Sequence, residues 1–104
     1  MEQGVDVFEA IAHPVRRDLL DRLANGERSV TDLARPFAVS RPAISQHLRV
    51  LREAGLVTER KVGRQRLYQL RAAPLSQVSE WARKYERFWP ERLDALGKYL
   101  EEQP

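Results

Sequence analysis

A chain of 104 residues allows one domain with a small core, and a hydrophobic share of 42% with a charged share of 32% excludes disorder throughout. The absence of cysteine excludes disulfides and thiol chemistry, and the absence of a long apolar run or a signal-peptide pattern predicts a cytoplasmic protein outside the membrane. The net charge of +3 is concentrated in residues 41–71, which hold eight Lys and Arg against two acidic residues. A nucleic-acid surface would explain this concentration, and an ordinary solvated face is the alternative.

Two helices are predicted before residue 26. The first covers Val5 to Ala12, with Val5, Phe8, Ile11 and Ala12 on one face that favours core packing; part of that face could meet a second subunit. His13 can cap the second helix, which begins at Pro14 and ends at Asn25-Gly26. Its apolar stripe consists of Val15, Leu19, Leu20 and Leu23.

A short helix capped by Ser29 and stopped by Pro36 leads through a tight connection to a longer one over Ser40 to Gly55. Ser40 can cap this longer helix, Pro42 fits its first turn, and Gly55 ends it. Its apolar face is predicted to hold Ile44, Leu48 and Leu51. Two helices in this arrangement form a helix-turn-helix pattern.

The other faces of the longer helix carry side-chain types that bond phosphate oxygens and base edges, so we predict that it lies in a DNA major groove. Gln46 could pair with adenine and Arg49 with guanine, with Ser45 as a third base-reading candidate, while Arg41 favours phosphate. The predicted DNA contacts of this helix are Ser40, Arg41, Ser45, Gln46, His47, Arg49 and Arg52.

After Gly55 the pattern becomes β-like. Residues Leu56–Val62 and Gln65–Leu70 flank Gly63-Arg64, which predicts a hairpin with a type II′-like turn. A basic hairpin directly after such a helix is typical of a wing that contacts phosphate or a minor groove. Its predicted DNA contacts are Arg60, Lys61, Arg64 and Arg66.

An amphipathic helix is predicted from Pro74 to Leu100, with a kink or break near Pro90. A domain this small offers too little core to bury so long an aromatic stripe, so we predict a symmetric dimer; packing on the chain's own helices is the alternative. The predicted interface consists of Val5, Phe8, Leu75, Val78, Trp81, Tyr85, Phe88, Trp89, Leu93 and Leu96.

Four stretches of the chain form a combined pattern: AIAHPVRRDLLDRL at 10–23, SVTDLA at 29–34, VSRPAISQHLRVLREAGLV at 39–57 and GRQRLYQL at 63–70. Together they carry a resemblance to the ArsR-type winged helix-turn-helix repressors. It implies a mainly α fold with a small β-hairpin, in the order α-α-α-α-β-β-α, forming one domain over 1–104 with a core at 5–71 and a dimerisation helix at 74–100. It also implies a homodimeric repressor on a pseudo-palindromic operator, often of its own operon.

The metal sites of this resemblance are missing. Metal-sensing relatives place a Cys-x-Cys pair where this chain has Ser29 and Thr31, which supply no thiolate. Others use histidines of the last helix, yet no histidine follows His47, and His13 with His47 would lack a further ligand. We therefore expect no metal and no cofactor, and the sequence names no small-molecule effector.

No enzyme signature occurs in the chain, such as a phosphate-binding Gly-rich loop, His-Glu-x-x-His or Gly-x-Ser-x-Gly. The sequence thus predicts a DNA-binding transcriptional repressor and not an enzyme. Two alternatives stay open: a winged helix that binds an acidic protein partner, and a ligand sensor of the same fold.

Overall fold

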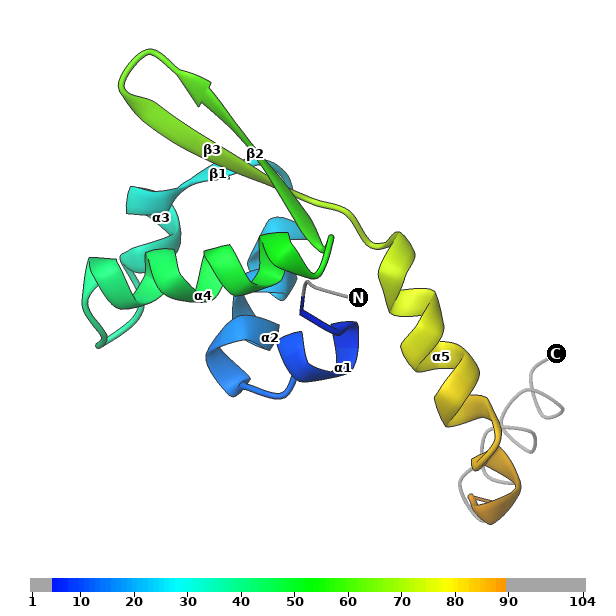
Figure 1. The fold of residues 1–104 in the computed structure, drawn as a ribbon. Helices are drawn as coiled ribbons and strands as arrows, with labels where there is room; N and C mark the ends of the chain where they lie inside the picture. Colours follow the sequence, from blue (N-terminus) through cyan, green and yellow to red (C-terminus); the bar gives the residue numbers. More distant parts are fainter. Residues whose placement is uncertain (1–4, 90–104) are drawn as a thin grey trace, which may run out of the picture.

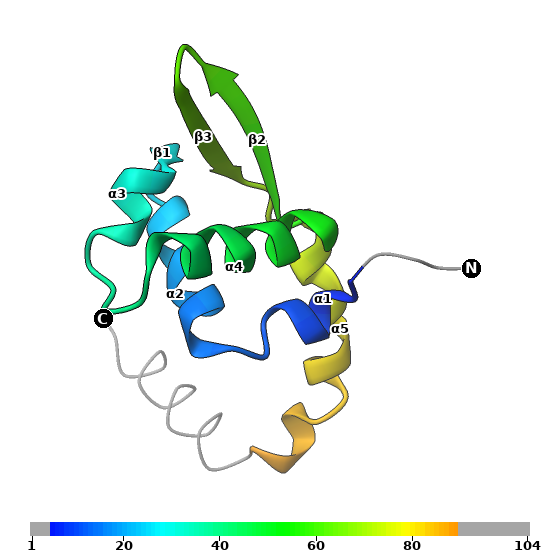
Figure 2. The same cartoon turned by 60° about the vertical axis from the view of Figure 1, so that its left-hand side comes forward.

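A computed structural model describes residues 5–89 as a helical body, a projecting hairpin and a last helix that leads away from the body (Figures 1 and 2). This element order confirms the predicted winged helix-turn-helix. None of the described helices is long and apolar enough to cross a bilayer. The elements in chain order are α1 (Val7–Ala10), α2 (Pro14–Leu23), β1 (Arg28–Ser29), α3 (Val30–Ala34), α4 (Arg41–Glu53), β2 (Val57–Val62), β3 (Gln65–Leu70), η1 (Ala73–Leu75), α5 (Ser76–Arg83) and η2 (Glu86–Phe88).

Side chains at the helix starts cap them as predicted. The Val15 N–H donates to His13 Nδ1 over 3.1 Å, and the Ala43 N–H donates to Ser40 Oγ over 3.2 Å. Each bond satisfies a backbone donor that the first turn of a helix leaves without a partner. After α4, Gly55 has a φ of +79°, a left-handed conformation that favours glycine, so the chain turns directly into β2.

The core lies under α4. Ile44, Leu48 and Leu51 are fully buried and contribute the apolar face that the sequence predicted. α1, α2, α3 and β2 all contact α4, so this helix is held from several sides. The remaining buried hydrophobic residues are Val7, Ala10, Leu19, Leu20, Leu23, Val30, Leu33, Leu56, Val57 and Tyr68.

The sheet has one strand more than the predicted hairpin. Its order is β1-β3-β2, and both pairings are antiparallel, with Arg28 opposite Tyr68 and Ser29 opposite Leu67. A strand of two residues is too short to show alternation, so no periodic pattern predicts β1. β1 ties the base of the hairpin to α3, whereas the tip beyond it stands clear of the body (Figure 1). At the turn Gly63 has a φ of +62° and Arg64 has a negative φ, as the predicted turn type requires.

The first helix is shorter than predicted, and the face that it buries differs from the predicted one. It covers only Val7–Ala10, and those two residues are its buried ones. The prediction that Phe8 and Ala12 pack inward is wrong, because both are exposed. In a helix of a single turn, the spacing of the apolar residues is compatible with more than one buried face. Packing against the surrounding elements then selects which face is buried.

The last helix ends earlier than predicted. α5 stops at Arg83, and the bond from the Tyr85 N–H to the Ala82 carbonyl (2.9 Å) belongs to a tighter 3₁₀ turn. A regular helix from Pro74 to Pro90 is therefore wrong. The predicted break at Pro90, and the continuation through Leu93, Leu96 and Leu100, lie outside the described residues.

Candidate nucleic-acid interface

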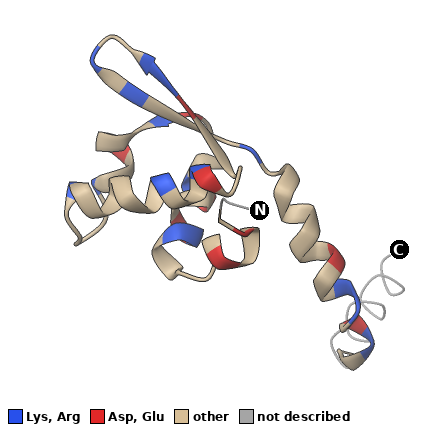
Figure 3. Cartoon of the chain, in the orientation of Figure 1, with Lys and Arg blue, Asp and Glu red and all other residues tan. Residues whose placement is uncertain are grey.

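α4 presents its polar face to solvent. Because Ile44, Leu48 and Leu51 fix the helix on the core, Ser45, Gln46 and Arg49 are left exposed. Figure 3 shows Lys and Arg on α4 and along the β2–β3 hairpin, which we call the wing. The structure thus places Arg41 and Ser45 of α4 around one space with Arg64 and Arg66 of the wing.

Several of the predicted DNA contacts are engaged in surface ion pairs. Arg49 lies 3.3 Å from Glu53, and Arg60 binds Glu27 in a bidentate pair with distances of 2.8 and 3.0 Å. Glu59 accepts from Arg66 over 2.7 Å and also pairs with Arg52. The hydrogen bond from Arg60 lowers the pKa of Glu27. The Arg49–Glu53 pair is exposed on both sides, and exposed pairs contribute little to stability, so Arg49 can exchange its carboxylate for a phosphate at small cost.

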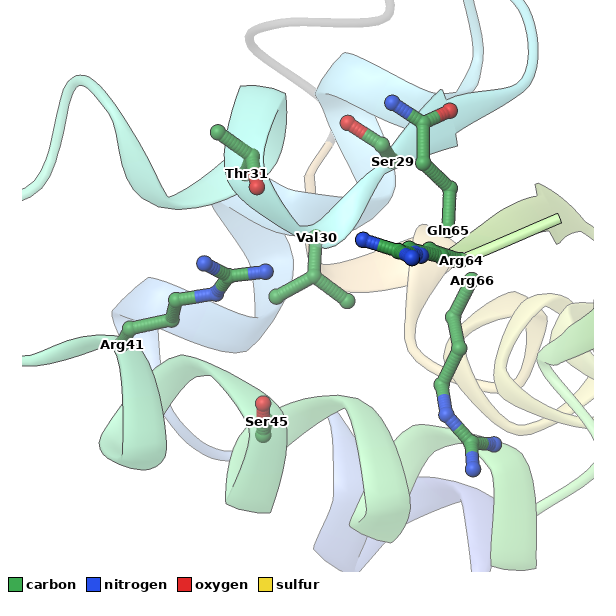
Figure 4. A pocket seen from close by; sticks show the side chains of 8 residues that line it. All are labelled: Ser29, Val30, Thr31, Arg41, Ser45, Arg64, Gln65 and Arg66. Atoms are coloured by element: carbon green, nitrogen blue, oxygen red, sulfur yellow. The ribbon is translucent and has the colours of Figure 1, made fainter. Parts of the chain in front are cut away.

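A pocket of about 290 Å³ lies between α3, α4 and the wing. Arg41 comes from the first turn of α4 and Arg64 from the tip of the wing, and neither forms an ion pair with any residue of the range 5–89. Thr31 also lines this pocket, which its position in the sequence does not predict, because only the fold places α3 beside these arginines. The lining residues are Ser29, Val30, Thr31, Arg41, Ser45, Arg64, Gln65 and Arg66 (Figure 4).

His47 does not join the other predicted DNA contacts. Its ring is half-buried and lies 4.5 Å from the ring of His13, between centroids. Arg16 Nη1 is 3.2 Å from His47 Nδ1, and a guanidinium can only donate, so this ring nitrogen is the unprotonated one. The structure therefore places the His47 ring against His13 and Arg16, with Nδ1 engaged by the Arg16 guanidinium.

Arg16 connects three helices through this contact. Its Nε donates to the carbonyl of Ala10 over 2.7 Å, at the end of α1, while its Nη1 reaches His47 on α4. One side chain of α2 thereby satisfies a terminal carbonyl of α1 and contacts α4.

This junction predicts a pH dependence of stability. Burial, then His13, then Arg16 lower the pKa of His47 from its usual 6.5, so the folded protein resists a proton that the unfolded chain accepts. The contribution of neutral His47 is fully present above pH 6.5 and is lost as the pH falls below it towards the folded pKa. We expect the free energy of unfolding, measured by urea titration between about pH 5 and 8, to fall on the acid side.

The matched variant for this prediction is His47→Gln, which removes the titrating group and keeps an acceptor for Arg16. Its unfolding free energy should change less between pH 6.5 and the acid end of the range than that of the wild type. If both proteins showed the same slope, the pH dependence would belong to another group.

Exposed aromatic rings connect α1 and α5. The Phe8 and Trp81 rings meet edge to face with centroids 5.8 Å apart, Trp81 and Tyr85 are 5.3 Å apart, and Tyr85 and Phe88 are 6.3 Å apart. We call Phe8, Trp81, Tyr85 and Phe88 the aromatic surface; exposed fractions run from 37% for Phe8 to 62% for Phe88.

The other predicted interface residues differ in how far they are exposed. Trp89 is exposed, whereas Val5, Leu75 and Val78 are half-buried against the core of their own chain. Leu93 and Leu96 lie outside the described residues.

One of the two positions that correspond to the metal-sensing Cys pair caps a helix in this chain. Ser29 is buried, and its Oγ accepts from the Asp32 N–H over 3.1 Å to cap α3. Within residues 5–89, no three His, Cys, Asp or Glu side chains are grouped so that they could hold a metal ion.

Comparison with known proteins places the chain among transcriptional regulators. A family model described as a helix-turn-helix domain matches residues 11–60. The HTH-type transcriptional regulator Rv2034 of Mycobacterium tuberculosis is 39% identical over 94 residues, which cover 90% of this chain and 85% of that protein. The transcriptional repressor SdpR of Bacillus subtilis is 36% identical over 76 residues, which cover 73% of this chain and 84% of that protein. The crystal structure of the ArsR family transcriptional regulator RHA00566 matches with a TM-score of 0.70 at 33% identity, covering 79% of this chain and 90% of that one.

Proposed function

Because the chain belongs to the ArsR family of winged helix-turn-helix, DNA-binding transcriptional regulators, we propose that it is a homodimeric repressor that binds a pseudo-palindromic operator without responding to a metal ion. The family consists of regulators and not of enzymes. A single observation carries the proposal. The apolar face of α4 is buried in the core, so its polar face is exposed in a fixed orientation beside the basic wing.

In the proposed complex each subunit inserts α4 into a major groove. Gln46 and Arg49 then read base edges, and the two copies address half-sites about 34–36 Å apart, one turn of the duplex. The remaining basic residues would fix the register on the backbone through phosphate. These positioning residues are Arg41, Arg52, Arg60, Lys61, Arg64 and Arg66.

Replacing either base reader should relax sequence preference. We expect Gln46→Ala or Arg49→Ala to weaken operator binding by roughly 1–3 kcal/mol and to remove discrimination at one position of each half-site. Binding to a set of operators with single base changes, followed by fluorescence anisotropy, measures both effects.

Arg83→Ala is the matched control for Arg49→Ala, because it removes the same charge from an exposed position of α5. It should leave affinity and preference unchanged. If Arg49→Ala behaved like this control, α4 would not read the groove as we propose.

The proposed dimer rests on the aromatic surface. Phe8 and α5 belong to the two ends of the chain, and their exposed rings form one continuous patch of the kind enriched at interfaces. A second copy of the chain can cover this patch with the same residues around a twofold axis. The same axis would place the two copies of α4 for a symmetric operator.

Gel-shift titration of the protein's own upstream DNA at two salt concentrations tests the proposed function. Sequence-specific binding that weakens steeply with salt supports a repressor that controls its own gene. Binding indifferent to sequence would instead favour the protein-interaction alternative. Zn²⁺ and EDTA should leave the titration unchanged, and a shift in affinity with either would contradict metal independence.

A further inference from the structure

The pocket between α3, α4 and the wing gathers donors of one kind. Figure 4 shows the hydroxyls of Thr31 and Ser45 and the guanidinium groups of Arg41 and Arg64 directed toward the space around Val30. Arg41 and Ser45 are four residues apart on α4 and therefore face the same side of the helix. Three different elements thus supply polar groups to one space.

The charge of this pocket is not balanced from within. No lining residue is acidic, and the ion pair of Arg66 with Glu59, at 2.7 Å, draws that side chain away along α4 (Figure 4). Arg41 and Arg64 remain without a carboxylate partner among residues 5–89. Guanidinium and hydroxyl donors without a competing carboxylate suit an oxyanion, and phosphate accepts hydrogen bonds from several directions.

We infer that this pocket binds one phosphate group, held by the charges of Arg41 and Arg64 and by hydrogen bonds from Thr31 and Ser45. The inference rests on the proposed function for the source of that phosphate: if α4 lies in a major groove, the strand bordering the groove passes between α4 and the wing. Free inorganic phosphate offers the same chemistry and is the second source.

This assignment changes the role of Ser45. Its spacing along α4 predicts a base reader like Gln46 and Arg49, but the structure turns it toward the pocket, beside Arg41. A residue that contacts phosphate contributes equally on every DNA sequence, whereas a base reader contributes only at its cognate base. The two roles therefore give different results with the same variant.

The experiment measures the affinity of Thr31→Val, Ser45→Ala and the control Thr58→Val for an operator duplex and a scrambled duplex. Thr58 is exposed on β2 and does not line the pocket. We expect the two pocket variants to bind both duplexes about tenfold more weakly, because each loses one hydrogen bond to a charged oxygen, with their sequence preference unchanged. Arg64→Gln should lower the salt slope by about one.

Two further arms distinguish the sources of phosphate. A scan of single neutral methylphosphonates along the duplex should find one position that costs the wild type about tenfold and costs Thr31→Val little, since that variant has already lost the contact. Titration with inorganic phosphate, followed by NMR, should move the amides of residues 31, 45 and 64 saturably if the pocket also takes the free anion. A response in either arm supports a phosphate site.

Failure of the inference is separate from failure of the proposed function. If the wild type preferred the operator while all three pocket variants bound like Thr58→Val, the inference would be overturned and the repressor proposal would stand. If the wild type bound both duplexes equally, the repressor proposal would fail, yet the pocket variants would still report on the phosphate site through the scrambled duplex. Loss confined to the operator duplex in Ser45→Ala would return Ser45 to the base readers and contradict the inference.

Discussion

Trp81→Glu is expected to produce a folded monomer whose affinity for the operator is about 10²–10⁴-fold lower, because two linked half-site contacts become independent ones. Trp81 is 49% exposed within its own chain and lies between Phe8 and Tyr85 in the aromatic surface. A carboxylate at the centre of the proposed interface would be buried without a partner beside its own twofold copy. Sedimentation gives the oligomeric state, and anisotropy on the operator gives the affinity.

Ser76→Glu provides the matched control, since it adds the same charge to a different face of α5, where Ser76 is exposed. It should remain a dimer with wild-type affinity, and both variants should keep the helical circular dichroism of the wild type. A Trp81→Glu protein that stayed dimeric would show that the twofold interface lies elsewhere on the chain.

Leu48→Ala is expected to reduce the free energy of unfolding by roughly 2–5 kcal/mol. Leu48 is 0% exposed, and α4 has neighbours on several sides, so the lost methyl groups leave a cavity that the core cannot close fully. Domains of this size are marginal, with a total of about 5–15 kcal/mol, so the loss is a large fraction of it. Urea unfolding followed by circular dichroism measures it.

Val39→Ala is the control for this effect, because Val39 is 42% exposed in the connection before α4. Its truncation should change stability by less than about 0.5 kcal/mol. If Leu48→Ala cost no more than Val39→Ala, α4 would not be anchored by its apolar face, and the rigid presentation of Gln46 and Arg49 would lose its physical basis.

Local signals in the sequence were sufficient for the helix-turn-helix and the wing. Ser40, Pro42 and Gly55 define α4 because capping, a fixed φ and a left-handed stop are properties of single residues and their nearest neighbours. The helical spacing of Ile44, Leu48 and Leu51 predicts the buried face of α4 and therefore also its exposed face. The alternation around Gly63-Arg64 predicted the hairpin in the same way.

Local signals of this kind do not predict the short and irregular elements. β1 has two residues and exists only because β3 lies beside it, and α1 is a single turn whose inward side is chosen by its neighbours. The end of α5 at Arg83 carries no glycine or proline, so no local residue announced it.

The residues of α4 are enough to predict an amphipathic helix with basic and amide side chains on its solvent-exposed side, because that pattern depends on residues within a few positions of one another. What those side chains face depends on how the helices and strands pack together. It turned His47 toward His13 and Arg16, and it brought Thr31, Ser45 and Arg64 around one pocket. Contacts between residues 14 to 34 positions apart are fixed by how helices and strands pack on the shared core, and no spacing along the chain encodes that packing.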